Sequence, residues 1–221
     1  MFSFVKDSQI SLFKHMTQRI IGITGGIATG KTTVSDYLHD TYGLPILDAD
    51  IYARQALTGD RLAKLSDRYG RLILDQQGNL DRRKLGTIVF ESVSERKWLE
   101  SLIHPYVQEC LLNESHRLAP ATVIMVIPLL FEAKMENLVT EIWTITCDPK
   151  EQLQRLMKRN HLLESEAKQR ISSQMSQSEK IELADVVIVN SDNTQELFFQ
   201  VDQALFNSPL EVQFSLAHCH A

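Results

Sequence analysis

Cysteine is scarce in this 221-residue sequence, and its three cysteines, Cys110, Cys147 and Cys219, show no metal-ligand spacing. An odd number of scattered thiols offers no disulfide framework and is typical of proteins in a reducing compartment. Long hydrophobic runs are also missing, since no stretch is long enough to span a membrane. Charged residues such as Lys6 interrupt the segment before the first predicted strand. We therefore expect a cytoplasmic protein with no signal peptide and no membrane partner.

Basic residues are also fewer than acidic ones, with 23 Lys and Arg against 28 Asp and Glu. The formal net charge is −5 and the isoelectric point is about 5.8, which argues against a protein whose main partner is nucleic acid. The sequence also has no internal repeats, no low-complexity tracts, no zinc-ligand spacing, no Rossmann fingerprint and no Ser, His and Asp arrangement for nucleophilic catalysis. We expect an enzyme that acts on a small molecule, and a monomer as its state, although the sequence does not exclude an oligomer.

One motif is complete. Residues 20–33 read IIGITGGIATGKTT, an apolar strand followed directly by the phosphate-binding signature that runs from Gly25 to Thr32. Glycines at both ends allow successive N–H groups to turn inward around phosphate oxygens, and the next helix adds the positive end of its dipole. Lys31 should reach the β and γ phosphates, and the Thr32 hydroxyl should ligate Mg²⁺. The predicted ATP-binding residues are Gly25, Gly26, Ile27, Ala28, Thr29, Gly30, Lys31, Thr32 and Thr33.

Strand-like and helical segments alternate along the chain. Short apolar runs occur at 20–24, 45–47, 121–127, 141–147 and 186–189, with helical patterns between them. This alternation predicts an α/β fold with a five-stranded parallel sheet. A long charged helical stretch at about 60–117 is a predicted insertion, and about 159–183 is a predicted polar lid. We assign residues 1–18 to an extension, 19–205 to the domain and 206–221 to a tail.

Carboxylates follow the second predicted strand at Asp48 and Asp50, at the end where open α/β sheets place ligands. Phosphoryl transfer to an alcohol needs a carboxylate near the hydroxyl, so we assign Asp50 as the base and Asp48 as a Mg²⁺ ligand. The alternative is that Asp50 only caps a helix beginning at Ile51. Arg155 and Arg159 share one helix face that could fold over the triphosphate, Arg155 as an ATP contact and Arg159 as a catalytic cation. The alternative for this pair is a solvated surface.

Several further segments resemble the dephospho-CoA kinase family. Beside the loop ITGGIATGKTTV at 23–34, they are LDADIYARQ at 47–55, LDRRKLGTIVF at 80–90, IHP at 103–105, VIPLLFE at 126–132, RLMKRN at 155–160, RISSQM at 170–175 and VIVNSDN at 187–193. Together they cover about residues 19–205. Two small departures are Ala28 where the family usually has Gly and Thr29 where it usually has Ser.

The resemblance implies ATP-dependent phosphorylation of the ribose 3′-hydroxyl of dephospho-CoA. It implies a three-layer P-loop kinase fold with core, lid and acceptor-binding helices. Asp50 then matches the presumed base, and Arg82, His104 and Leu129 the acceptor region. The alternatives for two of these are a helix kink at His104–Pro105 and a surface ion pair at Asp81–Arg82.

Two other functions compete with this prediction. A kinase similar to shikimate kinase also follows its phosphate loop with an Asp-x-Asp strand end, but the long helical stretch at 60–117 suits a bulkier acceptor. A nucleotide-dependent switch would need an Asp at the end of the 121–127 strand, where Pro128 stands, and a guanine-reading Asn-Lys-x-Asp, which the sequence lacks.

Overall fold

The computed structural model describes residues 18–119, 121–191 and 193–207. The chain divides into two compact units. The first contains the described residues up to Leu47 and from Ser115 onward, and the second is the helical unit Asp48–Glu114. The predicted extension and tail lie almost entirely outside the described residues. The functional boundaries expected near 60, 117, 159 and 183 stay predictions.

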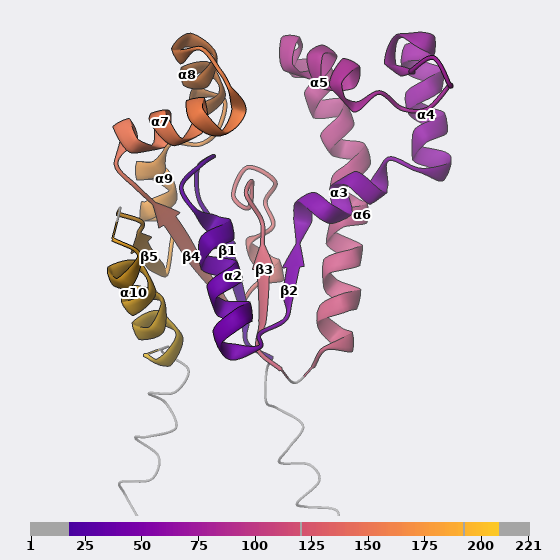
Figure 1. Ribbon diagram of the computed structural model, residues 1–221. Helices are drawn as coiled ribbons and strands as arrows, with labels where there is room; N and C mark the ends of the chain where they lie inside the picture. Colours follow the sequence, from indigo (N-terminus) through magenta and orange to yellow (C-terminus); the bar gives the residue numbers. More distant parts are fainter. Residues whose placement is uncertain (1–17, 120, 192, 208–221) are drawn as a thin grey trace, which may run out of the picture. The chain divides into compact units, whose positions relative to one another are not determined.

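A five-stranded sheet forms the centre of the first unit (Figure 1). Its strands are β1 (Ile20–Thr24), β2 (Ile46–Asp48), β3 (Val123–Val126), β4 (Glu141–Thr146) and β5 (Val186–Val189), in the order β2-β3-β1-β4-β5. β1 pairs in parallel with β3 and β4, and β4 pairs in parallel with β5. The predicted five-stranded α/β sheet is therefore confirmed, and its strands lie within or close to the predicted segments.

The central strands are apolar because they are covered on both faces. Every residue of β3 and β4 is buried, and Trp143 is the largest fully buried side chain among the described residues. The core joins Ile21 and Ile23 of β1 to α2 (Lys31–Tyr42) and α10 (Thr194–Phe206). Gly43 ends α2 in the left-handed conformation that the sequence suggested.

Three shorter helices follow β4. Asp148 caps α7 (Pro149–Asn160) by accepting from Lys150 and Glu151 N–H, as its position before Pro149 predicted. α8 (Glu164–Ser172) and α9 (Gln177–Glu182) make up most of the segment expected to be a polar lid. That expectation missed one feature, since Lys180 of α9 is completely buried.

The second unit is helical. It contains α3 (Ala49–Ala56), α4 (Gly59–Tyr69), a short 3-10 helix at Gly70–Ile73, α5 (Arg82–Glu91) and most of α6 (Val93–Arg117). Its small core is built on Leu65, Ile73 and Leu85. Between the 3-10 helix and α5, the Asp75 carboxylate accepts from Gln77 and Asn79 N–H and closes the predicted turn. Across the described part of the chain, no helix is long and apolar enough to cross a membrane.

Candidate active site

The phosphate loop takes a shape that only small residues permit. Gly25 has φ 144° and Gly30 has φ 102°, both in the range that side chains disfavour. A Cβ at Gly25 would lie 2.2 Å from the Ile145 carbonyl oxygen, and one at Gly30 would lie 1.9 Å from Asn190 Nδ2. Glycine is therefore required at both positions for two reasons, backbone conformation and space.

Ala28 departs from the family pattern at a demanding position. Its φ of 62° is left-handed, where an alanine is strained and a glycine is not. Ala28 therefore adopts a conformation that costs an alanine roughly 1–2 kcal/mol, and the expectation that it fits a tight loop stays a prediction.

Polar side chains from distant elements hold the loop backbone. Asn190 Nδ2 donates to the Thr29 carbonyl at 2.8 Å, and Gln152 Nε2 donates to the Ile27 carbonyl at 2.8 Å. The Ile27 N–H donates to Gln174 Oε1 at 2.8 Å. The sequence placed Gln174 only within the predicted lid at about 159–183, and it gave no role to Gln152 or Asn190. Their one signal is position, since Asn190 follows β5 just as the loop follows β1.

Lys31 and Thr32 lie at the start of α2, directly after the loop. Lys31 Nζ donates to the carbonyls of Gly25 and Gly26 at 2.9 and 2.8 Å, so its ammonium lies over the loop rather than in solvent. Thr32 and Thr33 are exposed in the first turn of α2, where helix N–H groups attract anions. The placement suits the phosphate and metal contacts predicted for this motif.

The two predicted cationic residues of α7 differ in environment. Arg155 is half-buried, pairs with Glu151 at 3.2 Å and donates to the Asn190 carbonyl at 3.4 Å. It is therefore one residue removed from the loop, because Asn190 itself holds Thr29. Arg159 is exposed one turn later and donates to Asn160 Oδ1 at 2.9 Å. Arg155 therefore contacts Asn190, the residue that holds the loop at Thr29, whereas Arg159 lies exposed on the surface of α7.

In the helical unit, Asp48 and Asp50 occupy different positions at the start of α3. Asp48 is the N-cap of α3, and its Oδ1 accepts the Asp50 N–H at 2.8 Å. The alternative in which Asp50 caps a helix from Ile51 is wrong, because the helix already begins at Ala49. Asp50 lies in the first turn of α3, and Asp48 holds the capping position before it.

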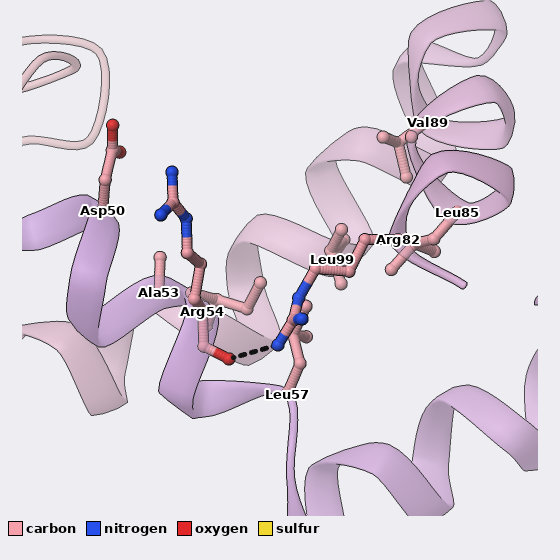
Figure 2. A pocket seen from close by; sticks show the side chains of 10 residues that line it. Asp50, Ala53, Arg54, Leu57, Arg82, Leu85, Val89 and Leu99 are labelled. Carbon is pink, nitrogen blue, oxygen red and sulfur yellow. Dashed lines mark hydrogen bonds between the residues drawn. The ribbon is translucent and has the colours of Figure 1, made fainter. Parts of the chain in front are cut away.

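A pocket of about 260 Å³ opens beside Asp50 within the helical unit. Its apolar part comes from Leu57, Leu85, Val89 and Leu99, and its charged part from Asp50, Arg54 and Arg82. Figure 2 shows Asp50 and Arg54 extending to the same side of α3, as their spacing of four residues dictates. Arg82 Nη2 donates to the Arg54 carbonyl at 3.3 Å, which turns its guanidinium toward α3. Arg54 was not predicted, although it stands in the LDADIYARQ segment.

Two predicted acceptor residues lie outside this pocket. His104 is next to Ile103, which lines it, but His104 itself does not. Burial lowers the pKa of the His104 imidazole, and the nearby Glu100 carboxylate opposes that shift. Pro105 is indeed inside α6, as the kink alternative required. Leu129 belongs to the first unit, in the loop after β3.

Across the described residues, no three His, Cys, Asp or Glu side chains gather in a way that could hold a metal ion. Mg²⁺ is commonly held by one or two protein oxygens together with substrate phosphates and water. The Thr32 hydroxyl and the Asp48 carboxylate are oxygen donors of the required kind.

Comparison with known proteins gives a consistent result. The family model for dephospho-CoA kinase matches residues 19–196. A dephospho-CoA kinase from Trichormus variabilis is 54% identical over 192 residues, covering 86% of this chain and 98% of that protein. One from Synechocystis is 53% identical over 190 residues, covering 85% and 94%.

Solved structures agree on the fold. A crystal structure of a Thermus thermophilus protein has a TM-score of 0.74 and 32% identity, covering 92% of this chain and 99% of that one. A dephospho-CoA kinase from Campylobacter jejuni has a TM-score of 0.65 and 27% identity, covering 86% and 96%. A shikimate kinase from Acinetobacter baumannii, at TM-score 0.50 and 16% identity, covers 88% and 97% and shares the fold alone.

Proposed function

The chain belongs to the dephospho-CoA kinase family, whose members phosphorylate dephospho-CoA with ATP in the last step of coenzyme A biosynthesis, and we propose that it performs this reaction on the ribose 3′-hydroxyl, releasing ADP. The observation that carries the proposal is the match of about half of all residues to dephospho-CoA kinases over nearly their full length. For the competing prediction, a kinase similar to shikimate kinase, the structural comparison supports the fold alone.

On the donor side, the phosphate loop binds the triphosphate of ATP. Its inward N–H groups and the start of α2 provide partial positive charge, and Lys31 adds a full charge held over the loop by two carbonyls. Arg155 and Arg159 of α7 supply further cationic charge for the transferring group, with Arg155 tied to the loop through Asn190. Most of this catalysis is positioning and charge stabilisation.

Thr32 and Asp48 would hold Mg²⁺. When bound, the ion would neutralise charge on the β and γ phosphates. Asp48 caps α3 through Oδ1, and its carboxylate would supply an oxygen to the ion. The cap fixes the rotation of that carboxylate, which makes it a directed donor.

On the acceptor side, the pocket of the helical unit binds dephospho-CoA. Its apolar wall suits an adenine or pantetheine surface, and Arg54 and Arg82 suit the phosphates that such an acceptor carries. Asp50 accepts the proton of the 3′-hydroxyl as that oxygen attacks phosphorus, and the leaving group is ADP. Direct in-line transfer needs no phosphoenzyme. Roles for His104 and Leu129 near the acceptor, a closing lid, and a cytoplasmic monomer stay predictions.

A turnover panel tests the proposal. ADP release is measured with ATP, Mg²⁺ and, in separate reactions, dephospho-CoA, shikimate and nucleoside monophosphates. Among these acceptors, only dephospho-CoA is expected to give rapid ADP release. Phosphorus NMR of the product should show a new 3′-phosphomonoester. Faster release with shikimate or with a monophosphate would overturn the assigned acceptor.

A further inference from the structure

A seven-residue segment, Gln174–Lys180, contacts the end of β4 and the loops that follow β1 and β3 in the first unit. It covers the connection from α8 and the first turn of α9. We propose that this segment, here called the brace, is a positioning element that fixes the shape of the phosphate loop, with Gln174 and Lys180 as positioning residues at its two ends.

At one end, the brace contacts the phosphate loop at Ile27. The Ile27 N–H donates to Gln174 Oε1 at 2.8 Å, while the Ile27 carbonyl accepts from Gln152 Nε2 at 2.8 Å. Gln177 Nε2 donates in turn to Gln152 Oε1 at 2.8 Å. Both backbone polar groups of Ile27 are thus held by side chains, one in the Gly26–Ile27 peptide and one in the Ile27–Ala28 peptide, which restricts rotation of the loop at Ile27.

The amide groups in this chain have a fixed order. Gln177 Oε1 accepts from the Cys147 N–H at 3.1 Å and from the Thr146 hydroxyl. With its oxygen turned to the end of β4, Gln177 can present only its NH₂ group to Gln152. Gln152 must then present its own NH₂ to Ile27. The strand end therefore dictates the direction of every bond as far as the loop.

At the other end, Lys180 ties the brace to the loop after β3. Its side chain is fully buried, and Nζ donates to Glu132 Oε2 at 2.9 Å and to the Pro128 carbonyl at 3.3 Å. Glu132 Oε1 accepts the Met175 N–H at 3.0 Å, so one carboxylate grips the brace twice. The Pro128 carbonyl also accepts from Thr24 Oγ1 at 3.2 Å.

These contacts give the brace three routes to the phosphate loop. One is direct, from Gln174 to the Ile27 N–H, and a second passes from Gln177 through Gln152 to the Ile27 carbonyl. The third passes from Lys180 through Pro128 to Thr24, the residue before Gly25. A buried ion pair adds little net stability compared with apolar side chains of the same size. Its effect here is to direct hydrogen bonds, but removing Lys180 alone also leaves the Glu132 carboxylate without its cation and costs stability. Gln174, which is in no ion pair, is therefore the cleaner position at which to test the loop.

The test is a double-mutant cycle on nucleotide binding, and it rests on the proposed ATP site. Calorimetry measures the Kd of the β,γ-imido analogue of ATP with Mg²⁺ for the full chain and for Gln174→Ala, Lys180→Met and the double variant. Each single change should raise the Kd about five- to twentyfold. The Kd of the double variant should lie within about twofold of that of the single variant that binds more weakly. Exposed neighbours on α8 provide matched controls, Gln169→Ala and Lys168→Met, which should stay within about twofold.

A second readout separates positioning from general damage. Gln174→Ala should raise the KM for ATP more than it lowers kcat, with a melting temperature close to that of the unaltered protein. If the unaltered protein binds no analogue, the proposed function fails and takes the brace with it. If the unaltered protein binds the analogue and Gln174→Ala binds it equally well, the brace proposal is overturned and the proposed function stands. The same holds if the effects of the two single changes on the free energy of binding simply add. Should Lys180→Met not fold, Gln174→Ala and its control decide.

Discussion

The phosphate loop and the pocket of the helical unit are built in opposite ways. The loop is mostly backbone, shaped by glycines at φ 144° and 102° and held by amide side chains from α7, the brace and the end of β5. The pocket is mostly side chains, in which three charged groups stand on an apolar wall. A single added methyl group should therefore damage the loop, whereas the pocket should lose its function only through specific side chains.

The two regions also differ in what supports them. Strands covered on both faces lie beneath the loop, and their hydrogen bonds leave little freedom at its base. The helical unit has a small core and depends more on surface groups, above all the Glu95 carboxylate, which accepts two bonds from Arg68 at 2.7 and 2.8 Å and one from the Tyr69 hydroxyl at 2.6 Å. Rigid backbone suits the phosphates common to all nucleotides, and variable side chains suit one acceptor.

The largest effect is expected from Gly30→Ala. Its Cβ would lie 1.9 Å from Asn190 Nδ2 at a positive φ, so the Asn190 amide would have to move and give up its hydrogen bond to the Thr29 carbonyl. ATP affinity should fall by about a hundredfold or more, as measured by calorimetry, since the loop's N–H groups would no longer converge. The matched control is Gly43→Ala at the other end of α2, which has φ 65° but open space around its Cβ position. It should cost roughly 1–2 kcal/mol of stability and leave affinity unchanged. An equal loss of ATP affinity in both variants would show that the contact between residue 30 and Asn190 does not set the shape of the loop.

A more selective effect is expected from Arg54→Ala. Removing one guanidinium from the pocket should raise the KM for dephospho-CoA by about 10- to 100-fold, the range of one charge-assisted hydrogen bond. The KM for ATP should stay within about twofold. Steady-state kinetics with each substrate varied in turn measures both, with the exposed Arg71→Ala in the same unit as control. An equal rise in both constants would remove Arg54 from acceptor binding.

The smallest effect is a pH dependence confined to the helical unit. Hydrogen bonds from Arg68 and Tyr69 lower the pKa of Glu95 to about 2 from its ordinary 4.5. Because the folded pKa is the lower one, this stabilisation is complete above pH 4.5 and is lost as the pH falls toward 2. Glu95→Gln should therefore reduce the melting temperature at pH 7 but much less at pH 3, whereas the exposed Glu91→Gln should change neither. A constant difference between Glu95→Gln and the unaltered protein across this range would refute the assignment.

The two regions were not equally readable from sequence. The loop could be predicted residue by residue because its spacing encodes the backbone shape, and the strands because continuous apolar runs mark burial on both faces. Gln152 and Asn190 were missed because a single glutamine or asparagine far along the chain carries no pattern that points to a loop peptide. Arg54 was missed for a related reason, since its role depends on which face of α3 lines a pocket. Lys180 looked like a surface residue until the structure placed Glu132 beside it.

The central claim is that the loop binds the phosphoryl donor while Asp50 of the helical unit activates the acceptor. Asp50→Asn tests it most directly, with calorimetry of the ATP analogue and dephospho-CoA turnover measured on the same preparation and Asp67→Asn, exposed on α4, as control. We predict analogue affinity within about threefold of the unaltered protein and turnover reduced by about 10²- to 10⁴-fold, as loss of a general base implies. Turnover equal to that of the unaltered protein would contradict the account.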